Sequence, residues 1–414
     1  GRRFHFLDNN GNEVCCLERI TINNRDFQLF DNPPDRRDTD SFKWDYNQKK
    51  FGRGDVIPLW IADMDFAVPE AVSQALSQRI SHPVFGYTYR SDEFVQAIQD
   101  WLASRFDWQV ARADLLFYPP GTVAAINCLV NLFSDEGDEI IVHTPAYPPL
   151  MNIVKQNQRV LVESSLVRHS DEYQIDFDQF EKCFSSRTKI LILCSPHNPT
   201  GRVWRRDELE KIASICRKNN VIVISDEVHA DLTLPGVEHF HFNRLPAEIR
   251  PKSITIVSVC KSFNLAALPQ STLICDSPEL KRKIKWAINT SQLNLDNALS
   301  ATAALAAYQS GADWLDNLRV YLKQNREWLA EFLKQEMPKV VLAEAQGTYL
   351  AWLDFRELNI SHGELAKLFV EKAGVGLYDG LMFGPPGEGF FRINLACSRA
   401  ILEQALQKMA SALR

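Results

Sequence analysis

Short apolar runs alternate with amphipathic segments over the middle of the chain, and this alternation constrains the fold more than any other feature of the sequence. The runs are rich in β-branched residues, and the segments between them, such as residues 207–218, have apolar positions at helical spacing. Strands that are apolar on both faces belong in a sheet that helices cover on both sides. The predicted strands are residues 139–143, 160–164, 190–194, 221–225, 254–259 and 272–275. We therefore expect an α/β core built on a mostly parallel sheet.

The chain on either side of this core has a different texture. Apolar positions recur at helical spacing over residues 69–80, and Ser91 has the side chain and the acidic neighbours of a helix N-cap. Beyond about residue 290 the sequence predicts helices at 314–335 and 361–373 and strands at 349–355 and 391–396. These elements suit a smaller α+β domain. The expected division is an N-terminal extension at 1–29, a small domain from 30–72 and 300–414, and a large domain at 73–299.

Composition and charge exclude several classes of protein. The 414 residues carry a net charge of −6, so we expect no basic surface for nucleic acid. No apolar stretch reaches the roughly 18 residues that span a bilayer, and no apolar segment follows the N-terminal arginines as in a secretory signal. The nine cysteines contain no C-x-x-C pair and predict free thiols in a reducing compartment. We therefore expect a cytoplasmic protein without a membrane partner.

Histidine and cysteine spacing predicts no metal site. His239 and His241 form an H-x-H pair, but no acidic or thiolate residue accompanies them at ligand spacing. We expect this pair to lie in a surface loop.

Polar residues follow the predicted strands, where an open α/β sheet binds its ligand. Gly121 and Thr122 stand directly before a predicted helix, whose free backbone N–H groups can hold a phosphate; a plain turn is the alternative. Asn198 lies in the sequence SPHNPTG, after the run 190–194. The prolines fix a rigid turn, which either has only that structural role or directs Asn198 at a ligand oxygen.

Two charged residues follow the next two strands. Asp226 comes directly after the run 221–225 and is either a solvated loop carboxylate or, in a cleft, the partner of a heterocyclic N–H cation. Lys261 comes directly after the strand that begins at residue 254. A lysine at such a place is rarely buried without a function, because its charge must be neutralised or bonded.

The order of these signals resembles the fold-type I pyridoxal-phosphate enzymes, and the wording is closest to the MalY/PatB-type C–S β-lyases. The matching segments are KWD at 43–45, WIADMDF at 60–66, FGYTYR at 85–90, HTPAYPP at 143–149, SPHNPTGRVW at 195–204, SDEVHADL at 225–232, CKSFN at 260–264 and FFRINLAC at 390–397. The resemblance runs from about residue 30 to the end of the sequence. It implies a fold-type I architecture, with a seven-stranded sheet in the large domain, and pyridoxal 5′-phosphate as the cofactor.

The resemblance implies roles for residues around the ring of the cofactor. Lys261 is similar to the lysine that binds the cofactor covalently, and Asp226 to the carboxylate that pairs with the ring nitrogen. Asn198 resembles the asparagine on the O3′ oxygen, and His229 stands where aminotransferases usually have a tyrosine near that oxygen. Tyr147 resembles the residue that stacks on the ring. The expected catalytic residues are Lys261, Asp226 and Tyr147.

Further residues resemble ligands of the phosphate group of the cofactor. They are Gly121, Thr122, Val123 and Ser258. Tyr87 is expected to reach the phosphate or the substrate across the interface of a homodimer.

The α-carboxylate of the substrate has its own expected ligands. Arg392 is similar to the arginine that clamps this carboxylate through two hydrogen bonds, a geometry that lysine does not supply. Ala62 is expected to border the same carboxylate through its backbone, and Asn394 is a more distant candidate.

Three positions depart from the pattern of the superfamily. Cys260 stands where many relatives have serine, and Ala267 and Pro269 stand where aminotransferases carry a glycine and then an arginine on the phosphate. The missing arginine fits the lyase branch and leaves a less positive phosphate site.

The implied function is a C–S β-lyase that cleaves cystathionine or cysteine S-conjugates to pyruvate, ammonia and a thiol. This function would place the protein in amino-acid metabolism and methionine biosynthesis. The same residues also fit a class I/II aminotransferase, which returns the proton to the cofactor. A third candidate, of another class, is a cofactor-binding regulatory protein that acts through protein–protein contact.

Overall fold

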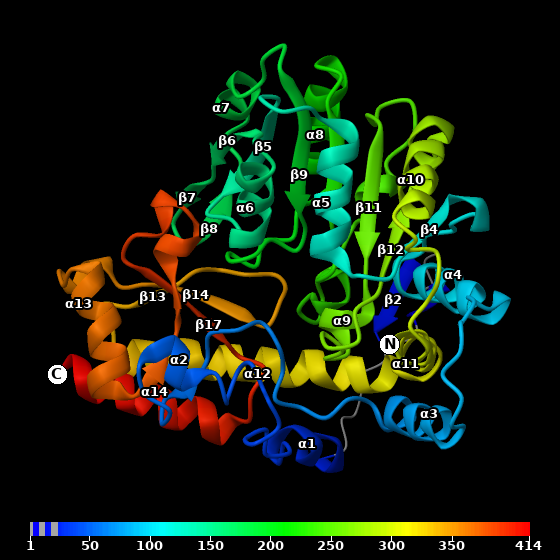
Figure 1. Ribbon diagram of the computed structural model, residues 1–414. Coiled ribbons are helices and arrows are strands. Elements are labelled where there is room, and N and C mark those ends of the chain that lie inside the picture. The colour runs from blue at the N-terminus through cyan, green and yellow to red at the C-terminus, as the bar shows by residue number, and fades with distance from the viewer. Residues whose placement is uncertain (1–2, 8–12, 18–23) are drawn as a thin grey trace.

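The computed structural model describes residues 3–7, 13–17 and 24–414, and its central element is a seven-stranded sheet (Figure 1). In spatial order the strands are β4 (Leu115–Tyr118), β12 (Ser271–Ile274), β11 (Ser253–Val257), β10 (Ile222–Asp226), β9 (Thr188–Cys194), β5 (Glu139–Thr144) and β6 (Val160–Ser165). β12 runs antiparallel to both of its neighbours, and the other neighbouring pairs are parallel. The expected α/β fold with a mostly parallel sheet is confirmed.

Side chains alternate between the two faces of this sheet, and helices cover both. Ile140 and Ile192 lie on one face, and Ile141 and Leu191 lie on the other. The helices of the first face are α5 (Thr122–Phe133), α6 (Pro148–Gln156) and α10 (Pro278–Thr290), and those of the second are α7 (Phe177–Lys182) and α8 (Arg206–Lys218). This two-sided burial is the reason that the strands are apolar at nearly every position.

A second sheet of four antiparallel strands is formed by the C-terminal part of the chain. Its order is β13 (Val341–Leu342), β14 (Leu350–Asp354), β17 (Phe390–Asn394) and β16 (Tyr378–Asp379). The helices packed on it are α12 (Ala312–Glu336), α13 (His362–Lys367), which wider helical turns continue to Ala373, and α14 (Arg399–Leu413). β3 (Ile57–Pro58) pairs with β15 (Val375–Gly376), so a segment that precedes the large sheet in sequence joins this region.

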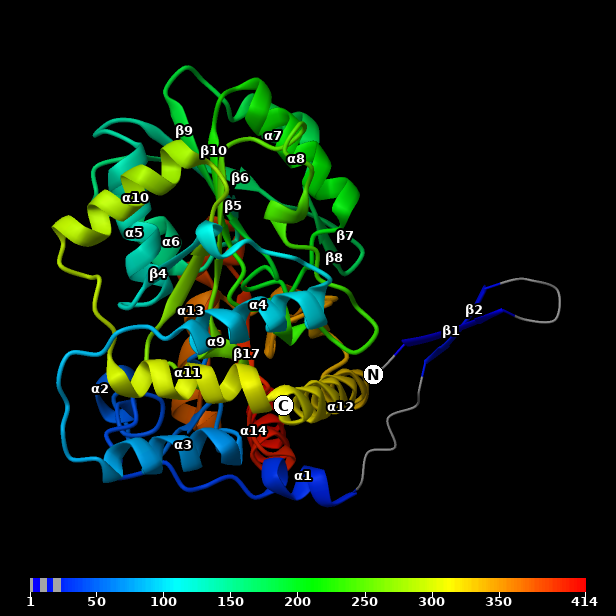
Figure 2. The ribbon, with the colours of Figure 1, turned by 90° about the vertical axis from the view of Figure 1, so that its right-hand side faces the viewer.

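In the view of Figure 1 the remaining helices lie mainly below the large sheet. They are α1 (Asn24–Asp31), α2 (Asn47–Phe51), α3 (Glu70–Ser81), α4 (Asp92–Phe106), α9 (Val259–Ser262) and α11 (Ala298–Ser310). Figure 2 shows α11 between α3 and α4, both of which it contacts. The Ser91 hydroxyl accepts the Phe94 N–H at 3.1 Å, which confirms the predicted N-cap of α4.

Two hairpins complete the described structure. β1 (Arg3–Leu7) and β2 (Glu13–Leu17) pair antiparallel within the segment expected as an N-terminal extension, and β7 (Val167–His169) pairs with β8 (Glu172–Gln174). α1 begins at Asn24, also within that segment, and contacts α12. Over the described residues, no helix combines the length and the apolar character needed to cross a bilayer.

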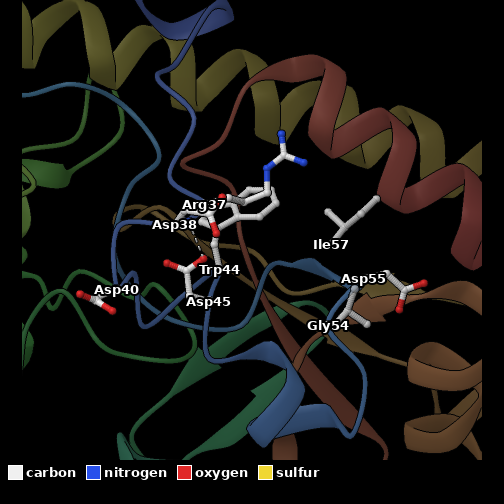
Figure 3. Close-up of a pocket in the computed structure, with 9 residues that line it drawn as sticks. Arg37, Asp38, Asp40, Trp44, Asp45, Gly54, Asp55 and Ile57 are labelled. Atoms are coloured by element: carbon white, nitrogen blue, oxygen red, sulfur yellow. Dashed lines mark hydrogen bonds between the residues drawn. The ribbon is translucent and has the colours of Figure 1, made fainter.

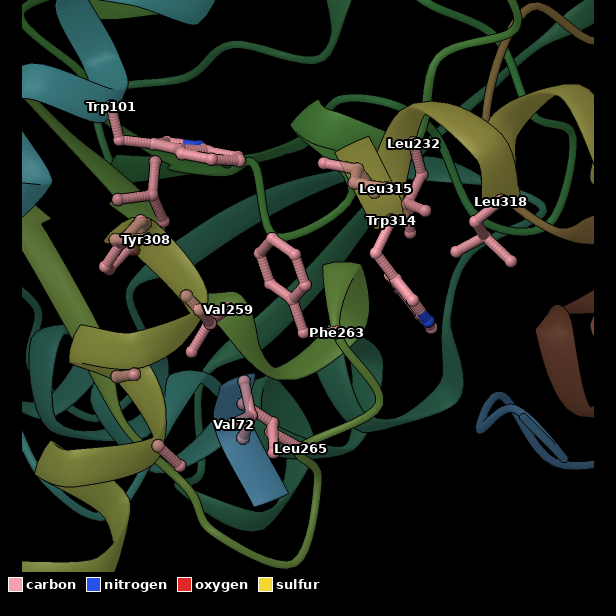
Figure 4. Packing of buried hydrophobic residues seen from close by; sticks show 14 of the residues in the cluster. Val72, Trp101, Leu232, Val259, Phe263, Leu265, Tyr308, Trp314, Leu315 and Leu318 are labelled. Carbon is pink, nitrogen blue, oxygen red and sulfur yellow. The ribbon is translucent and has the colours of Figure 1, made fainter. Parts of the chain in front are cut away.

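The turn that carries Lys261 is anchored in the core by a neighbouring aromatic residue (Figure 4). The buried ring of Phe263 lies 5.7 Å from the ring of Trp101 and 6.0 Å from that of Trp314, measured between centroids. Gly311 makes room for it, since a Cβ atom there would lie 2.3 Å from the Phe263 ring. This packing fixes the position of the turn.

One strand ends earlier than the sequence predicts. The run 254–259 was expected to be extended throughout, whereas β11 ends at Val257. The reason is that Ser258 acts as the N-cap of α9, where its hydroxyl accepts the Cys260 N–H at 3.2 Å.

Candidate active site

Both sheets contribute charged residues to one site at the carboxyl ends of the large sheet. Asp226 is the last residue of β10, Asn198 lies in the turn after β9, and Lys261 lies in α9 directly after β11. Arg392 comes from β17 of the second sheet, and its Nη1 donates to Asn198 Oδ1 at 2.9 Å. The structure thus brings together residues that are up to 194 positions apart.

Arg392 is a buried cation that has no acidic partner among the residues that the structure describes. Its Nη2 donates to the carbonyl oxygen of Trp60 at 2.9 Å, and its Nε has no partner within the described chain. The rings of Tyr378 and Phe383 lie 4.6 and 5.1 Å from its guanidinium carbon. Burial lowers the pKa of Arg392 to about 10, so the side chain remains charged at neutral pH. A buried guanidinium with two neutral acceptors is well suited to bind a carboxylate.

Asp226 is buried, and the half-buried Lys261 lies close to it. Burial raises the pKa of Asp226 to about 6. The Val228 N–H, at 3.4 Å, and the charge of Lys261 lower this pKa, but they offset the effect of burial only in part. Burial lowers the pKa of Lys261, while the carboxylate of Asp63 acts in the opposite direction. The Lys261 amine donates to the carbonyl oxygen of Ala62 at 2.6 Å. The environment therefore favours a neutral amine beside a carboxylate that has few donors.

Tyr147 and His229 belong to the same site. Burial raises the pKa of Tyr147. The charge of Arg392 lowers this pKa and the charge of Asp226 raises it, so the phenol lies within the field of both charges. Burial, together with the charges of Lys261 and Arg392, lowers the pKa of His229 to about 3. The imidazole of His229 is thus neutral, and its Nδ1 has no partner among the described residues.

The start of α5 provides a place for an anion. Gly121 has a φ of +91° there, and a Cβ atom on it would lie 3.1 Å from the Cβ of Pro269. The N–H groups of Thr122 and Val123 are in the first turn and have no acceptor within the helix. Pro269 adds no charge at this place, so the attraction for an anion comes from the helix start.

Two other expected ligands have different surroundings. The Ser258 hydroxyl donates to the carbonyl oxygen of Gln270 at 2.5 Å, so this donor is already used. Tyr87 is 95% exposed, in the segment between α3 and α4, and within the described chain it makes no hydrogen bond to the other expected residues. A single chain does not bring Tyr87 into the site.

Ala62 lies within the backbone segment of residues 60–66, which we call the strap, and Asn394 hydrogen-bonds to this segment. The Ala62 carbonyl accepts the Lys261 amine, and the Asn394 amide donates to the carbonyl oxygen of Ile61 at 2.8 Å. The strap therefore passes directly beside Lys261 and Arg392.

The expectation that His239 and His241 lie in a surface loop is wrong. Both imidazoles are buried, and both hydrogen-bond to one carboxylate oxygen of Glu227, His239 at 2.8 Å. The rings of Phe106 and Trp108 pack against His241, with centroids 4.4 and 4.7 Å away. The spacing rule failed because the acidic partner lies 12 and 14 positions away, at the end of β10.

Hydrogen bonds account for this cluster. The three ligand atoms of Glu227, His239 and His241 lie within 4.8 Å of one another. Ligands of one zinc ion lie about 3.3 Å apart when each is about 2.0 Å from the metal, whereas 2.8 Å separates His239 Nε2 from the carboxylate. The other oxygen of Glu227 accepts the Ser225 hydroxyl at 2.7 Å and the Phe242 N–H at 2.9 Å. These donors fasten the chain next to Asp226.

A separate surface pocket of about 680 Å³ contains no expected site residue (Figure 3). Arg37, Asp45 and Asp55 are among the residues that line it. The Asp45 carboxylate accepts the backbone N–H groups of Asp38, Thr39 and Ser41, so it builds the loop rather than awaiting a ligand.

The residues brought together fit pyridoxal phosphate. Asp226 is a buried carboxylate whose raised pKa reports an incomplete counter-charge, which a ring N–H cation would complete. His229 has an unpartnered buried nitrogen, and the start of α5 offers free N–H groups to a phosphate. Lys261 supplies a buried amine close to Asp226.

Sequence reasoning missed two residues that contact the strap. The Tyr349 hydroxyl donates to the Ala62 carbonyl at 2.9 Å, and the Asn264 side chain bonds the N–H of Met64 at 3.0 Å and its carbonyl at 2.9 Å. Asn264 belongs to the CKSFN segment and has a φ of +56°, a conformation that asparagine tolerates. Tyr349 carried no signal, because it reads as the first apolar residue of a strand.

Comparisons with known proteins agree with this geometry. Residues 54–409 match the family described as aminotransferase class I and II. Cystathionine beta-lyase PatB of Bacillus subtilis is 37% identical over 385 residues, which are 93% of this chain and 99% of that protein. Protein MalY of Escherichia coli is 35% identical over 383 residues, 92% of this chain and 97% of that protein. The crystal structure of a PLP-bound C–S lyase from Staphylococcus hominis has a TM-score of 0.85 and 34% identity, covering 93% of this chain and 97% of that one.

Proposed function

The chain belongs to the family of class I and II aminotransferases, and on this premise we propose that it is a pyridoxal-phosphate-dependent C–S β-lyase. Its substrate is cystathionine or a related cysteine S-conjugate; elimination of the thiol leaves aminoacrylate, which one water molecule hydrolyses to pyruvate and ammonia. The observation that carries this proposal is the convergence of three charged groups at the ends of the strands, the buried Asp226 and Arg392 and the half-buried Lys261.

Arg392 binds the α-carboxylate of the amino acid. Its two terminal N–H groups now donate to Asn198 and Trp60, and a carboxylate replaces these neutral acceptors with two charge-assisted bonds. The rings of Tyr378 and Phe383 keep water from the guanidinium, which strengthens the ion pair. The substrate is thereby oriented with its carboxylate fixed.

The cofactor is held by residues at the ends of the strands. Gly121, Thr122 and Val123 at the start of α5 would bind the phosphate, and Asp226 would pair with the ring N–H. Tyr147 would stack on the ring, Asn198 and His229 would hold its O3′ oxygen, and Ser258 would add a phosphate contact if its hydroxyl leaves Gln270. When bound, pyridoxal phosphate delocalises the electron pair that the loss of a proton leaves on the substrate Cα.

Lys261 moves the proton. Its amine, kept neutral by burial, takes the proton from Cα, and the C–S bond then breaks with its electron pair on sulfur. The ammonium form of Lys261 returns the proton to the departing thiolate. Asp226 stays ionised throughout and keeps the ring nitrogen protonated.

The lyase is favoured over an aminotransferase by the phosphate end of the site. Pro269 packs against Gly121 at the place where aminotransferases of the superfamily direct an arginine at the phosphate. Cystathionine beta-lyase PatB and the C–S lyase of Staphylococcus hominis each match 93% of this chain.

We further propose a homodimer. The segment between α3 and α4 exposes large apolar side chains, which monomeric proteins seldom leave in contact with water. They are Val84 at 61%, Phe85 at 58%, Tyr87 at 95% and Tyr89 at 82% exposure. In the dimer Tyr87 would enter the site of the second copy. Light scattering on the purified protein tests this state.

We place the enzyme in the cytoplasm and in methionine biosynthesis. The cysteines whose side chains the structure describes are free thiols, in keeping with a reducing compartment. Cleavage of cystathionine yields homocysteine, whose methylation gives methionine.

The decisive experiment supplies L-cystathionine without any keto acid. A β-lyase releases pyruvate and free thiol in equal amounts over many turnovers, and Lys261→Ala abolishes both. Transfer of the amino group to an added keto acid without release of thiol would identify an aminotransferase instead. A protein that binds the cofactor but does neither would leave only a regulatory role.

A further inference from the structure

A single backbone oxygen beside Lys261 accepts two side-chain donors. The carbonyl oxygen of Ala62 receives the Lys261 amine at 2.6 Å and the Tyr349 hydroxyl at 2.9 Å. A carbonyl oxygen has two lone pairs, so these two donors occupy both. Tyr349 is 1% exposed, and burial raises its pKa, so its hydroxyl remains a neutral donor.

The strap holds this oxygen in place. The Asn394 amide donates to the carbonyl groups on either side of Ala62. The Asn264 side chain binds both the N–H and the carbonyl of Met64. Because the neighbouring peptide groups are fixed from both sides, the Ala62 carbonyl does not turn away when the Lys261 amine moves.

The charges around Lys261 act in opposing directions. Burial and Arg392 favour the amine, whereas Asp63 and Asp226 favour the ammonium form. The Ala62 oxygen also favours the ammonium form, because a charged N–H donates a stronger hydrogen bond than a neutral one. Tyr349 weakens that contribution, since an oxygen that already accepts one hydrogen bond attracts a second donor less.

We propose that Tyr349 is a positioning residue for the catalytic lysine: by occupying one lone pair of the Ala62 carbonyl, it confines the Lys261 amine to the other. This inference rests on the proposed function only in that it gives the lysine amine the role of base. It assigns a role to the Tyr349 hydroxyl, which donates a hydrogen bond to the Ala62 carbonyl.

Replacement of Tyr349 by phenylalanine removes the hydroxyl and keeps the ring. We expect kcat for cystathionine to fall about tenfold, as for the loss of one buried hydrogen bond, with KM within about twofold because Arg392 is unchanged. We also expect the acidic limb of the kcat–pH profile to move to higher pH, because Lys261 holds its proton more strongly.

A second measurement does not depend on turnover. In the full-length protein freed of cofactor, the acetylation of Lys261 by acetic anhydride, followed by mass spectrometry over a range of pH, reports the midpoint for loss of its proton. Tyr349→Phe should raise this midpoint. Asp63→Asn should lower it, because it removes a charge that favours the ammonium form.

A matched control is Tyr173→Phe. Tyr173 is also a buried tyrosine, and its hydroxyl accepts the Trp352 indole N–H at 3.1 Å. This variant should lose stability without moving the acetylation midpoint or the pH profile.

The outcomes separate this inference from the proposed function. If the midpoint of Tyr349→Phe equals that of the wild type, the positioning role is wrong, even where kcat has fallen. If the midpoint rises as expected but the wild type releases no thiol from cystathionine, the positioning role stands and the proposed lyase function fails.

Discussion

Acid should destabilise the folded protein through two buried histidines behind the candidate site. His143 and His197 line the same small interior region as Tyr147 and Asn198. Burial lowers the pKa of His143 to about 4, and burial together with His143 lowers the pKa of His197 to about 3. Within the described part of the chain neither imidazole has a carboxylate partner, and their Nδ1 atoms share hydrogen bonds with hydroxyl groups at 3.1 and 2.9 Å. Both residues are therefore neutral in the folded protein.

The size of the effect follows from the difference between the two states. In the unfolded chain both histidines have a pKa near 6.5, so as the pH falls the unfolded chain binds protons that the folded protein does not. The stabilisation is fully present above pH 6.5 and is lost as the pH falls toward 4. At pH 5, which is 1.5 units below the unfolded value, each histidine lowers the free energy of unfolding by about 2 kcal/mol. Together they remove about 4 kcal/mol, a large share of the roughly 5–15 kcal/mol of a typical domain.

The assay is urea unfolding of the cofactor-loaded protein, followed by circular dichroism between pH 7.5 and 5. His143→Asn removes one of the two titrating groups, so its free energy of unfolding should fall less steeply, by about 1.4 kcal/mol per pH unit. This comparison cancels groups common to both proteins, including Asp226, whose raised pKa acts with the opposite sign. His169→Asn is the matched control, because His169 is exposed and should leave the slope unchanged. Equal slopes in wild type and His143→Asn would refute the reasoning.

Three other substitutions test the site. Arg392→Lys should lower kcat/KM for cystathionine about a hundredfold, since lysine loses one of two charge-assisted bonds to the carboxylate, while cofactor absorbance stays normal. Asp226→Asn should lower turnover at least about a hundredfold. It should also raise the free energy of unfolding of the cofactor-free protein by about 3 kcal/mol at pH 7.5, because it removes a buried carboxylate whose pKa is raised to about 6. A cofactor-free variant that unfolds at lower urea concentration than the wild type would contradict this. Glu227→Ala should lower the midpoint of thermal unfolding sharply, because it leaves the donors of Ser225, His239 and His241 unsatisfied, and each buried unsatisfied donor costs about 1–3 kcal/mol of stability. A midpoint near that of the wild type would show that water replaces the carboxylate.

The large sheet could be predicted from the sequence because its strands, apart from the edge strand β6, are buried on both faces and are therefore mostly apolar. The observed bounds of the six predicted strands lie within two residues of the predicted ones, and β4 was not among them. The strand-end rule then placed Asn198, Asp226 and Lys261 at one edge without any knowledge of the loops. Arg392 followed from the resemblance alone, because it lies in a second sheet whose position relative to the first has no local signal.

The contacts of the strap could not be predicted in this way. Lys261 and Tyr349 donate to a backbone carbonyl, which every residue carries, so no residue type marks the acceptor. The contact between Glu227 and the two histidines His239 and His241 also had no signal in the sequence. Glu227 lies in the segment 225–232, in which only the expected cofactor ligands Asp226 and His229 were given a role.

The two neighbouring acidic residues at the end of β10 show what separates a structural carboxylate from a functional one. Successive side chains of a strand point to opposite faces. Glu227 meets His239, His241, Ser225 and the Phe242 N–H, and the charges and donors of these partners lower its pKa in spite of complete burial. Asp226 points the other way and finds one distant N–H at 3.4 Å, so burial raises its pKa. The fold thus satisfies one carboxylate fully and leaves its neighbour short of donors, and a deficit of this kind is stable only where a cation completes it. The sequence singled out Asp226 by its place at the strand end and by the resemblance, and the distribution of donors in the folded chain supplies the physical difference from Glu227 that the proposed role of Asp226 requires.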